Sequence, residues 1–248
     1  MKETRLFYCP ALPDDIQPPF ETTLPDDEAA HVVRVLRLSD GDEILLTNGR
    51  GTMARGTICE ANKRACNVRI EETWQPKPLW QNNIHLAVAP TKNTDRMEWL
   101  VEKATEIGVD RITFLTTTNS ERRNLRLDRL QRNAISAMKQ SHKARLPLLE
   151  GPTPFDSFLD TIADTPFKYI AHCYEEDVAH KPLLLDALTT DGDALVMIGP
   201  EGDFSIDEVR AATAKGFQAV SLGESRLRTE TAALAAVHMM YLRKRLPQ

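Results

Sequence analysis

With 248 residues, of which 42% are hydrophobic and 27% charged, the chain has the composition of a globular protein with one large or two ordinary domains. Its apolar runs are too short to span a bilayer and its first residues lack a signal-peptide core, so we expect a cytoplasmic protein without membrane contact. Without export, disulfides between the four scattered cysteines are not expected; their spacing, with no CxxC, argues against a zinc site, and we expect no bound metal.

The net charge of −5 argues at first against a nucleic-acid partner, but the charge is unevenly distributed. Between Arg122 and Arg145 the chain carries eight Lys or Arg residues and a single acid, Asp128. Screening confines the field of such a block to roughly 10 Å, so an acidic protein can still bind phosphates there. A solvated helix face would show the same pattern, and charge alone leaves both interpretations open.

The first 73 residues contain short segments in which apolar and polar residues alternate, as they do in strands. Their close spacing predicts a small β-barrel or sandwich, interrupted by a helical turn near residues 25–34. We expect the apolar residues around the end of that turn, Val32, Val33, Val35 and Leu36, to lie in the core. The expected strands are residues 4–8, 43–47, 52–59 and 65–73.

Residues 74–82 contain two prolines, which block both helix and central strand, and we expect a linker there. From residue 83 to 248 apolar strands alternate with amphipathic helices, which predicts an α/β domain with a parallel sheet covered on both faces. The expected strands are residues 84–89, 109–115, 167–172, 194–198 and 217–222.

Helix ends in this second part carry recognisable signals. Asp95 and Glu98 have the spacing of the N-cap and N3 residues of a capping box, and so do Ser205 and Glu208. Gly108 stands where a glycine commonly ends a helix. A further helix is expected over residues 127–140, and the last one over residues 231–245.

Two segments rich in polar groups each follow a predicted strand and precede a helix, which is where ligands bind in open α/β sheets. The first is GPEGDFS (199–205), whose glycines let a ligand approach the backbone closely. The second is LGESRLRTETA (222–232), which places arginines, hydroxyls and a carboxylate near a helix N-terminus. The chain has neither a P-loop nor a GxGxxG motif, so these segments alone predict only a polar ligand between two loops.

These two segments resemble the motifs of the SPOUT methyltransferases, and specifically those of the RsmE family. Segments similar to the family's occur in order along the chain, at residues 5–7, 31–37, 95–108, 120–122 and 140–141. The family methylates N3 of one uridine in 16S ribosomal RNA of the small subunit. The resemblance therefore implies this activity, S-adenosylmethionine as the cofactor and 16S rRNA as the partner.

The resemblance also implies an architecture. It predicts a PUA-like β-barrel that binds RNA over residues 1–73, and a SPOUT domain over residues 83–248. The C-terminal part of that domain would be threaded into a trefoil knot, an exception to the rule that chains do not thread loops. The family further implies a homodimer in which the knot regions pack together.

The family's cofactor is held mainly by main-chain groups of the two loops, which here would put Leu222 and Leu227 against the adenine. The residues expected to bind the cofactor are Ile198, Gly199, Pro200, Glu201, Gly202, Ser221, Leu222, Gly223, Leu227, Thr229 and Thr231.

Methylation at N3 requires that the N3 proton be removed, and a base or an anion-stabilising group should help. We hypothesise that Arg228 stabilises the uridine anion through a carbonyl oxygen, while Glu230 orients the base or accepts the proton. Glu230 could instead be an ordinary acid at a helix N-terminus. The residues expected to contact RNA are Arg5, His31, Arg34, Arg37, Asn93, Arg96, Arg122, Arg123, Lys139 and His142.

The chain departs from the family at three places. Asp203 stands where the family usually has glycine, Arg226 is displaced by one position from the family's arginine, and Lys139 stands where glutamate is common. Two other functions remain open: a SPOUT enzyme that acts on transfer RNA or on ribose 2′-oxygens, and a non-catalytic RNA-binding protein of ribosome assembly.

Overall fold

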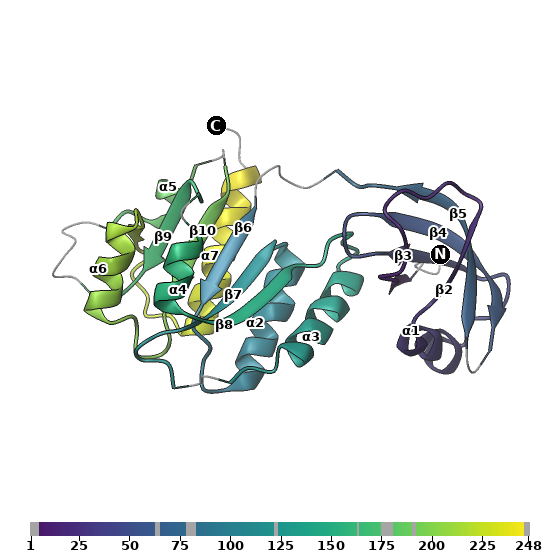
Figure 1. Ribbon diagram of the computed structural model, residues 1–248, viewed down its shortest axis with the longest axis horizontal. Helices are drawn as coiled ribbons and strands as arrows, with labels where there is room; N and C mark the ends of the chain where they lie inside the picture. Colours follow the sequence, from purple (N-terminus) through teal and green to yellow (C-terminus); the bar gives the residue numbers. More distant parts are fainter. Residues whose placement is uncertain are drawn as a thin grey trace. The chain divides into compact units, whose positions relative to one another are not determined.

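A computed structural model describes residues 5–62, 65–77, 83–121, 124–162, 164–174, 181–189 and 192–245. The chain divides into two compact units (Figure 1). Unit 1 comprises residues 1–78 together with 135–146, and unit 2 comprises residues 79–134 and 147–248. The limits expected from the sequence, 1–73 and 83–248, do not assign residues 135–146 to the N-terminal unit.

Unit 1 is built on a five-stranded sheet in the order β1-β3-β4-β5-β2, in which β1 and β3 are parallel and the other pairs antiparallel. A buried apolar cluster that includes Phe7, Ile44 and Val68 forms its core. The strands are β1 (Leu6–Tyr8), β2 (Phe20–Thr23), β3 (Glu43–Thr47), β4 (Met53–Ala61) and β5 (Cys66–Trp74).

A short helix, α1 (Asp26–Ala30), continues into a π-helical segment, η1 (His31–Leu36). Val32 is fully buried there, but Val35 is 64% exposed, so the expectation that Val35 belongs to the core is wrong. A π-helix turns more slowly per residue than an α-helix because its hydrogen bonds span five residues. Residues 32 and 35 therefore do not share one face, as they would in an α-helix.

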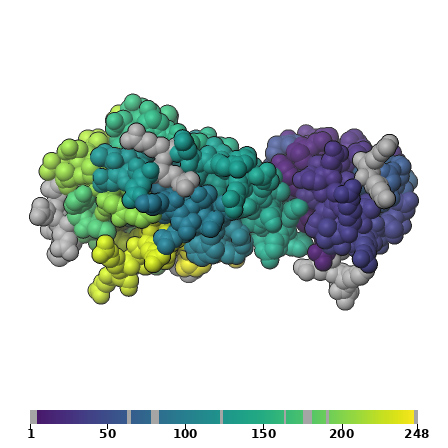
Figure 2. All heavy atoms as spheres, turned by 90° about the horizontal axis from the view of Figure 1, so that it is seen from below, coloured from purple at the N-terminus to yellow at the C-terminus, as the bar shows by residue number. Residues whose placement is uncertain are grey.

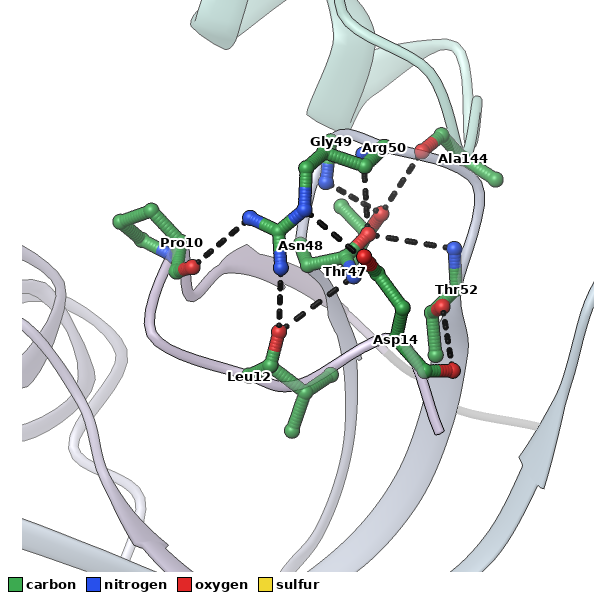
Figure 3. A network of polar contacts seen from close by, with 9 residues as sticks. All are labelled: Pro10, Leu12, Asp14, Thr47, Asn48, Gly49, Arg50, Thr52 and Ala144. Carbon is green, nitrogen blue, oxygen red and sulfur yellow. Dashed lines mark hydrogen bonds and ion pairs between the residues drawn. The ribbon is translucent and has the colours of Figure 1, made fainter. Parts of the chain in front are cut away.

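The loop 48–52 between β3 and β4 holds two other parts of unit 1 (Figure 3). The guanidinium of Arg50 donates hydrogen bonds to the carbonyls of Pro10 and Leu12 and to the carboxylate of Asp14. The side-chain amide of Asn48 donates to the same carboxylate at 2.7 Å. The loop thereby fixes the chain between β1 and β2.

The same loop binds the segment 135–146. The hydroxyl of Thr47 and the N–H of Gly51 both donate to the carbonyl of Ala144, at 3.1 and 3.0 Å. The N–H of Leu146 donates in turn to the carbonyl of Gly49 at 2.8 Å. We call this loop and its partners in 10–14 and 144–146 the clamp.

Unit 2 contains a six-stranded sheet in the order β11-β9-β10-β6-β7-β8, with every pair parallel. Strands β6 and β10 at its centre are buried along their whole length, which agrees with the continuous apolar runs of the sequence. The strands are β6 (Ile84–Val88), β7 (Arg111–Thr116), β8 (Leu148–Pro154), β9 (Phe167–Ala171), β10 (Ala194–Ile198) and β11 (Gln218–Val220).

Helices cover both faces of this sheet (Figure 1). Residues of α4 and α6, such as Phe158 and Val209, pack against Leu195 and Met197 of β10 in one buried cluster. Helices α2 and α7 pack against each other, and α7 also packs on β6 and β10. The helices are α2 (Thr94–Ile107), α3 (Leu127–Gln140), α4 (Phe155–Thr161), α5 (Leu184–Ala187), α6 (Ile206–Ala214) and α7 (Thr229–Arg245).

Helix α2 begins at a different residue from the one expected. Its N-cap is Asn93, whose backbone is extended, as an N-cap requires. The side-chain oxygen of Asn93 accepts the N–H of Asp95 at 2.9 Å. Asp95 lies inside the first turn, so the expected capping box is wrong. Glu98 instead faces α3, where Arg129 lies 2.6 Å from its carboxylate.

The other helix ends agree with the sequence. Gly108 ends α2 with a φ of 117°, and Ser205 and Glu208 form the predicted capping box of α6. Cys59 and Cys173 are exposed, Cys9 and Cys66 are buried, and all four thiols are free. Among the described residues, no helix is long and apolar enough to cross a membrane.

Candidate functional site

The first glycine-rich loop, 199–205, leaves the central strand β10 and enters α6. Gly199 is packed so closely that a Cβ there would lie 3.0 Å from the N atom of Phe204. The loop turns tightly because the N–H of Asp203 donates to the carbonyl of Pro200 at 3.0 Å. A side chain at position 199 would therefore crowd the backbone of Asp203 and Phe204.

Side chains tie this loop to two neighbouring loops, which follow β6 and β7. Glu201 accepts the N–H of Lys92 after β6, at 3.1 Å. The amide of Asn119 after β7 donates to the carbonyls of Gly202 and Asp203, both at 3.1 Å. The loop is thus held in one conformation before any ligand arrives, which lowers the entropic cost of binding.

Asp203, at the position where the family that the sequence resembles usually has glycine, has a left-handed backbone with a φ of 62°. Asp tolerates this conformation better than most residues because its short side chain bonds to nearby backbone groups. One carboxylate oxygen accepts the N–H of Phe204 and the other that of Cys173 after β9, each at 2.7 Å. Burial, and then the negative charge of Asp203, raise the pKa of the Cys173 thiol, so Cys173 is not an activated nucleophile.

The capping box of α6 also joins this network. Glu208 is buried, and its two carboxylate oxygens accept the N–H groups of Ser205 and Thr118, each at 2.7 Å. Thr118 follows β7, so Glu208 fixes both the start of α6 and the neighbouring loop.

The second loop, 221–228, leaves β11 and enters α7. The hydroxyl of Ser221 accepts the N–H of Gly223 at 3.1 Å. Gly223 has a φ of 116°, and a Cβ there would meet nothing within 4 Å, so open space lies beside its backbone. Leu222 and Leu227 are half-buried, whereas the residues between them are exposed. The first residues of the loop are thus held by the Ser221 hydrogen bond, and the backbone at Gly223 is accessible to a ligand.

At the start of α7, Glu230 is only 8% exposed. Its Oε1 lies 3.5 Å from Nη1 of Arg96 on α2, and its Oε2 has no hydrogen-bond partner among the described residues. Asp95, Arg96, Trp99, Glu230 and Thr231 together line an open hollow of about 300 Å³. Figure 2 shows the yellow segment that leads into α7 at the surface beside the blue segment of α2.

The structure brings some expected site residues together and separates others. Glu230 and Thr231 share the hollow with Arg96, which we expected to contact RNA. Arg228 is exposed, and the cation beside Glu230 is Arg96 instead. Neither Trp99 nor Asn119 was proposed for the site from the sequence. Asn119 could have been found, because it lies in the loop that follows the predicted strand ending at residue 115.

The expected RNA contacts lie in different surroundings. In unit 1, Arg5, His31, Arg34, Arg37 and His142 are exposed. Lys139 is ion-paired to Glu28, which is 4% exposed, and Asn93 caps α2, so both residues also serve the fold. Arg122 and Arg123 lie outside the described residues.

Comparison with known proteins places this chain in a family. Residues 78–241 match the family described as RNA methyltransferase domain, and residues 24–71 match the RNA methyltransferase PUA domain. Over 221 residues the chain is 30% identical to the ribosomal RNA small subunit methyltransferase E of Rickettsia conorii, with 88% of each chain covered. The chain belongs to this family.

Solved structures agree with the family. A protein from Porphyromonas gingivalis is 42% identical, with a TM-score of 0.87 over 97% of this chain and 98% of that one. A ribosomal RNA small subunit methyltransferase E from Neisseria gonorrhoeae, bound to S-adenosyl methionine, is 28% identical with a TM-score of 0.79 and the same coverage. The expected combination of an N-terminal PUA-like domain with a C-terminal α/β domain on a parallel sheet is thereby confirmed.

Proposed function

We propose that this protein uses S-adenosylmethionine to methylate N3 of one uridine in 16S rRNA of the small ribosomal subunit. The observation that carries the proposal is the pair of preformed loops in a chain that belongs to the methyltransferase E family. Whether the required RNA is naked or assembled into subunits is an outcome of the test below.

The two loops fit S-adenosylmethionine. The open space beside Gly223 and the tight turn after Gly199 give a ligand access to main-chain N–H and C=O groups. Leu222 and Leu227 offer apolar surface to the adenine. The bound cofactor supplies an electrophilic methyl group, and positioning provides much of the acceleration of such a displacement.

The reaction also needs the N3 proton to leave the uridine. Glu230 is the acid next to the second loop, and a carboxylate with an unused oxygen can accept that proton. Arg228, exposed at the start of α7, stabilises the negative charge on a uridine carbonyl oxygen once the RNA is bound. The uridine must be unpaired or extruded, because N3 lies on its Watson–Crick edge.

Three further features belong to the proposal by family membership. The C-terminal part of unit 2 forms a trefoil knot, and two copies pair through it as a homodimer. The exposed basic residues of unit 1, among them Arg34 and Arg37, bind RNA phosphates. The protein works in the cytoplasm, where ribosomes assemble.

Two experiments test the function. Calorimetric titration with S-adenosylmethionine should show binding at one site per chain. Transfer of labelled methyl groups to 16S rRNA and to small subunits, followed by mass spectrometry of nucleosides, should yield 3-methyluridine. A 2′-O-methylated nucleoside or a transfer RNA product would instead make it a SPOUT enzyme with another target. The absence of cofactor binding would indicate a non-catalytic assembly protein.

A further inference from the structure

The hollow between α2 and α7 has the volume and the lining residues that a site for one nucleobase requires. Its volume of about 300 Å³ is at the lower end of the range of small-molecule pockets, which suits a single base rather than a whole nucleotide chain. Trp99 lies on its wall and is 42% exposed, which is unusual for so large an apolar side chain.

The carboxylate of Glu230, in the hollow, lacks a hydrogen-bond donor, and a bound base could provide one. Glu230 is buried, yet its Oε2 accepts no hydrogen bond from the described residues, and its Oε1 is 3.5 Å from Arg96. A buried acceptor left without a donor is unfavourable, so such groups in folded proteins usually have a reason. The last torsion of a glutamate side chain is soft, so we infer that rotation of the carboxylate brings the buried oxygen toward a donor in the hollow.

The polar groups of the hollow match one base. The Watson–Crick edge of uracil carries a carbonyl, an N–H and a second carbonyl. The hollow offers the guanidinium of Arg96 as a donor, the carboxylate of Glu230 as an acceptor and the hydroxyl of Thr231 as a donor. Cytosine presents an amino group and an unprotonated N3 there, and would leave the carboxylate of Glu230 without its donor.

We propose that this hollow binds the target uridine of the RNA, with Trp99 stacked on the base and Arg96, Glu230 and Thr231 reading its Watson–Crick edge. The inference rests on the proposed function and deepens it, because it assigns the choice of uridine over cytidine to named groups. It also assigns the base as the RNA group that Arg96 contacts, and it moves Thr231 from the expected cofactor contacts to the base.

The first test separates base binding from cofactor binding. Trp99→Ala should raise the KM for the RNA about tenfold or more through loss of stacking, and Thr231→Val should raise it about tenfold. Both variants should bind S-adenosylmethionine with the wild-type Kd. Leu148→Ala is the control, because Leu148 is another exposed apolar residue of unit 2 that does not line the hollow.

The second test concerns specificity. RNA in which the target uridine is replaced by cytidine should compete poorly with the natural RNA for the wild-type enzyme. For binding to the Glu230→Gln variant, the cytidine RNA should compete about as well as the uridine RNA, because the glutamine amide can donate to the cytosine N3.

Three results would overturn the inference. These are an unchanged KM for RNA in Trp99→Ala, a weakened cofactor Kd in Thr231→Val, and dissociation of a dimer by Trp99→Ala at the concentration where activity is lost. The last would assign Trp99 to a protein interface. A wild-type protein that binds no S-adenosylmethionine would contradict the proposed function itself, so the two failures are distinguishable.

Discussion

Glu208 and Glu230, two buried glutamates at helix N-termini, differ in the number of hydrogen bonds that their carboxylate oxygens accept. Both oxygens of Glu208 accept backbone N–H groups at 2.7 Å, and its own N–H donates to Ser205. In Glu230, one oxygen lies 3.5 Å from the guanidinium of Arg96, and the other has no partner in the described part of the chain. Residues that serve function often leave stability unoptimised, and Glu230 fits this pattern.

Substitution should separate the two roles. Glu208→Gln replaces one acceptor by a donor that faces an N–H group, and should lower the free energy of unfolding by about 1–2 kcal/mol. Glu230→Gln should leave that free energy unchanged or higher, yet slow single-turnover methylation about 100-fold or more. Urea unfolding and rapid-quench kinetics on both variants measure the contrast. Equal losses of stability and equal rates would contradict it.

Asp203 combines an unfavourable backbone conformation with two favourable hydrogen bonds. Asp203→Ala keeps the left-handed φ without the bonds, whereas Asp203→Gly removes the bonds and the steric cost together. The alanine variant should therefore be less stable than the glycine variant by about 1 kcal/mol. Asp207→Ala is a suitable control because Asp207 is exposed and lies four residues away. A more stable alanine variant would refute this account.

His85 should make stability depend on pH. Its side chain is 7% exposed, bonded to Thr113 Oγ1 at 2.8 Å, and burial followed by the charge of Arg111 lowers its pKa to about 3. Below pH 6.5 the unfolded chain therefore takes up a proton that the folded chain does not. From pH 7 to pH 5 the free energy of unfolding should fall by about 2 kcal/mol more in the wild type than in His85→Gln. Parallel curves for the two proteins would show that His85 is not responsible.

At the level of elements, the sequence was informative wherever an element is buried on a regular pattern. The strand 194–198 and the helix 127–140 have the predicted limits, because apolar periodicity reflects burial directly. Strand β8 contains Gly151, Pro152 and Pro154, which all weaken a strand prediction, and its prolines are tolerated because β8 lies at the edge of the sheet. The short strand β2 and helices α4 and α5 are stabilised by tertiary packing and were not predicted.

In the candidate site, too, features that are local in sequence were predictable and those that depend on tertiary packing were not. The two loops were recognisable because their residue types are local in sequence. The pairing of Glu230 with Arg96 was not, since it depends on the packing of α7 against α2 over more than a hundred residues. The cap of α2 was assigned to the wrong residue for a simpler reason. Asn93 and Asp95 are both good caps, and only the backbone conformation decides between them.

At the scale of the whole molecule, unit 1 depends on a segment from far along the chain. Lys139, which comes 111 residues after Glu28, supplies the counter-charge of that buried acid. Lys139→Met should destabilise the protein by about 3–5 kcal/mol because it leaves a buried charge alone. The double variant Glu28→Gln with Lys139→Met should recover most of the loss. Chemical unfolding of the three proteins tests this, and an undiminished loss in the double variant would contradict it.

The clamp has a consequence for the order in which this protein is made. Loop 48–52 leaves the ribosome early, but its partners at 144–146 are synthesised only after residues 79–134, which belong to the other unit. We therefore expect the N-terminal unit to complete its fold only after residues 79–134 have been synthesised. A nascent chain stalled before residue 135 should expose loop 48–52 to proteases, whereas one that has released residue 146 should protect it.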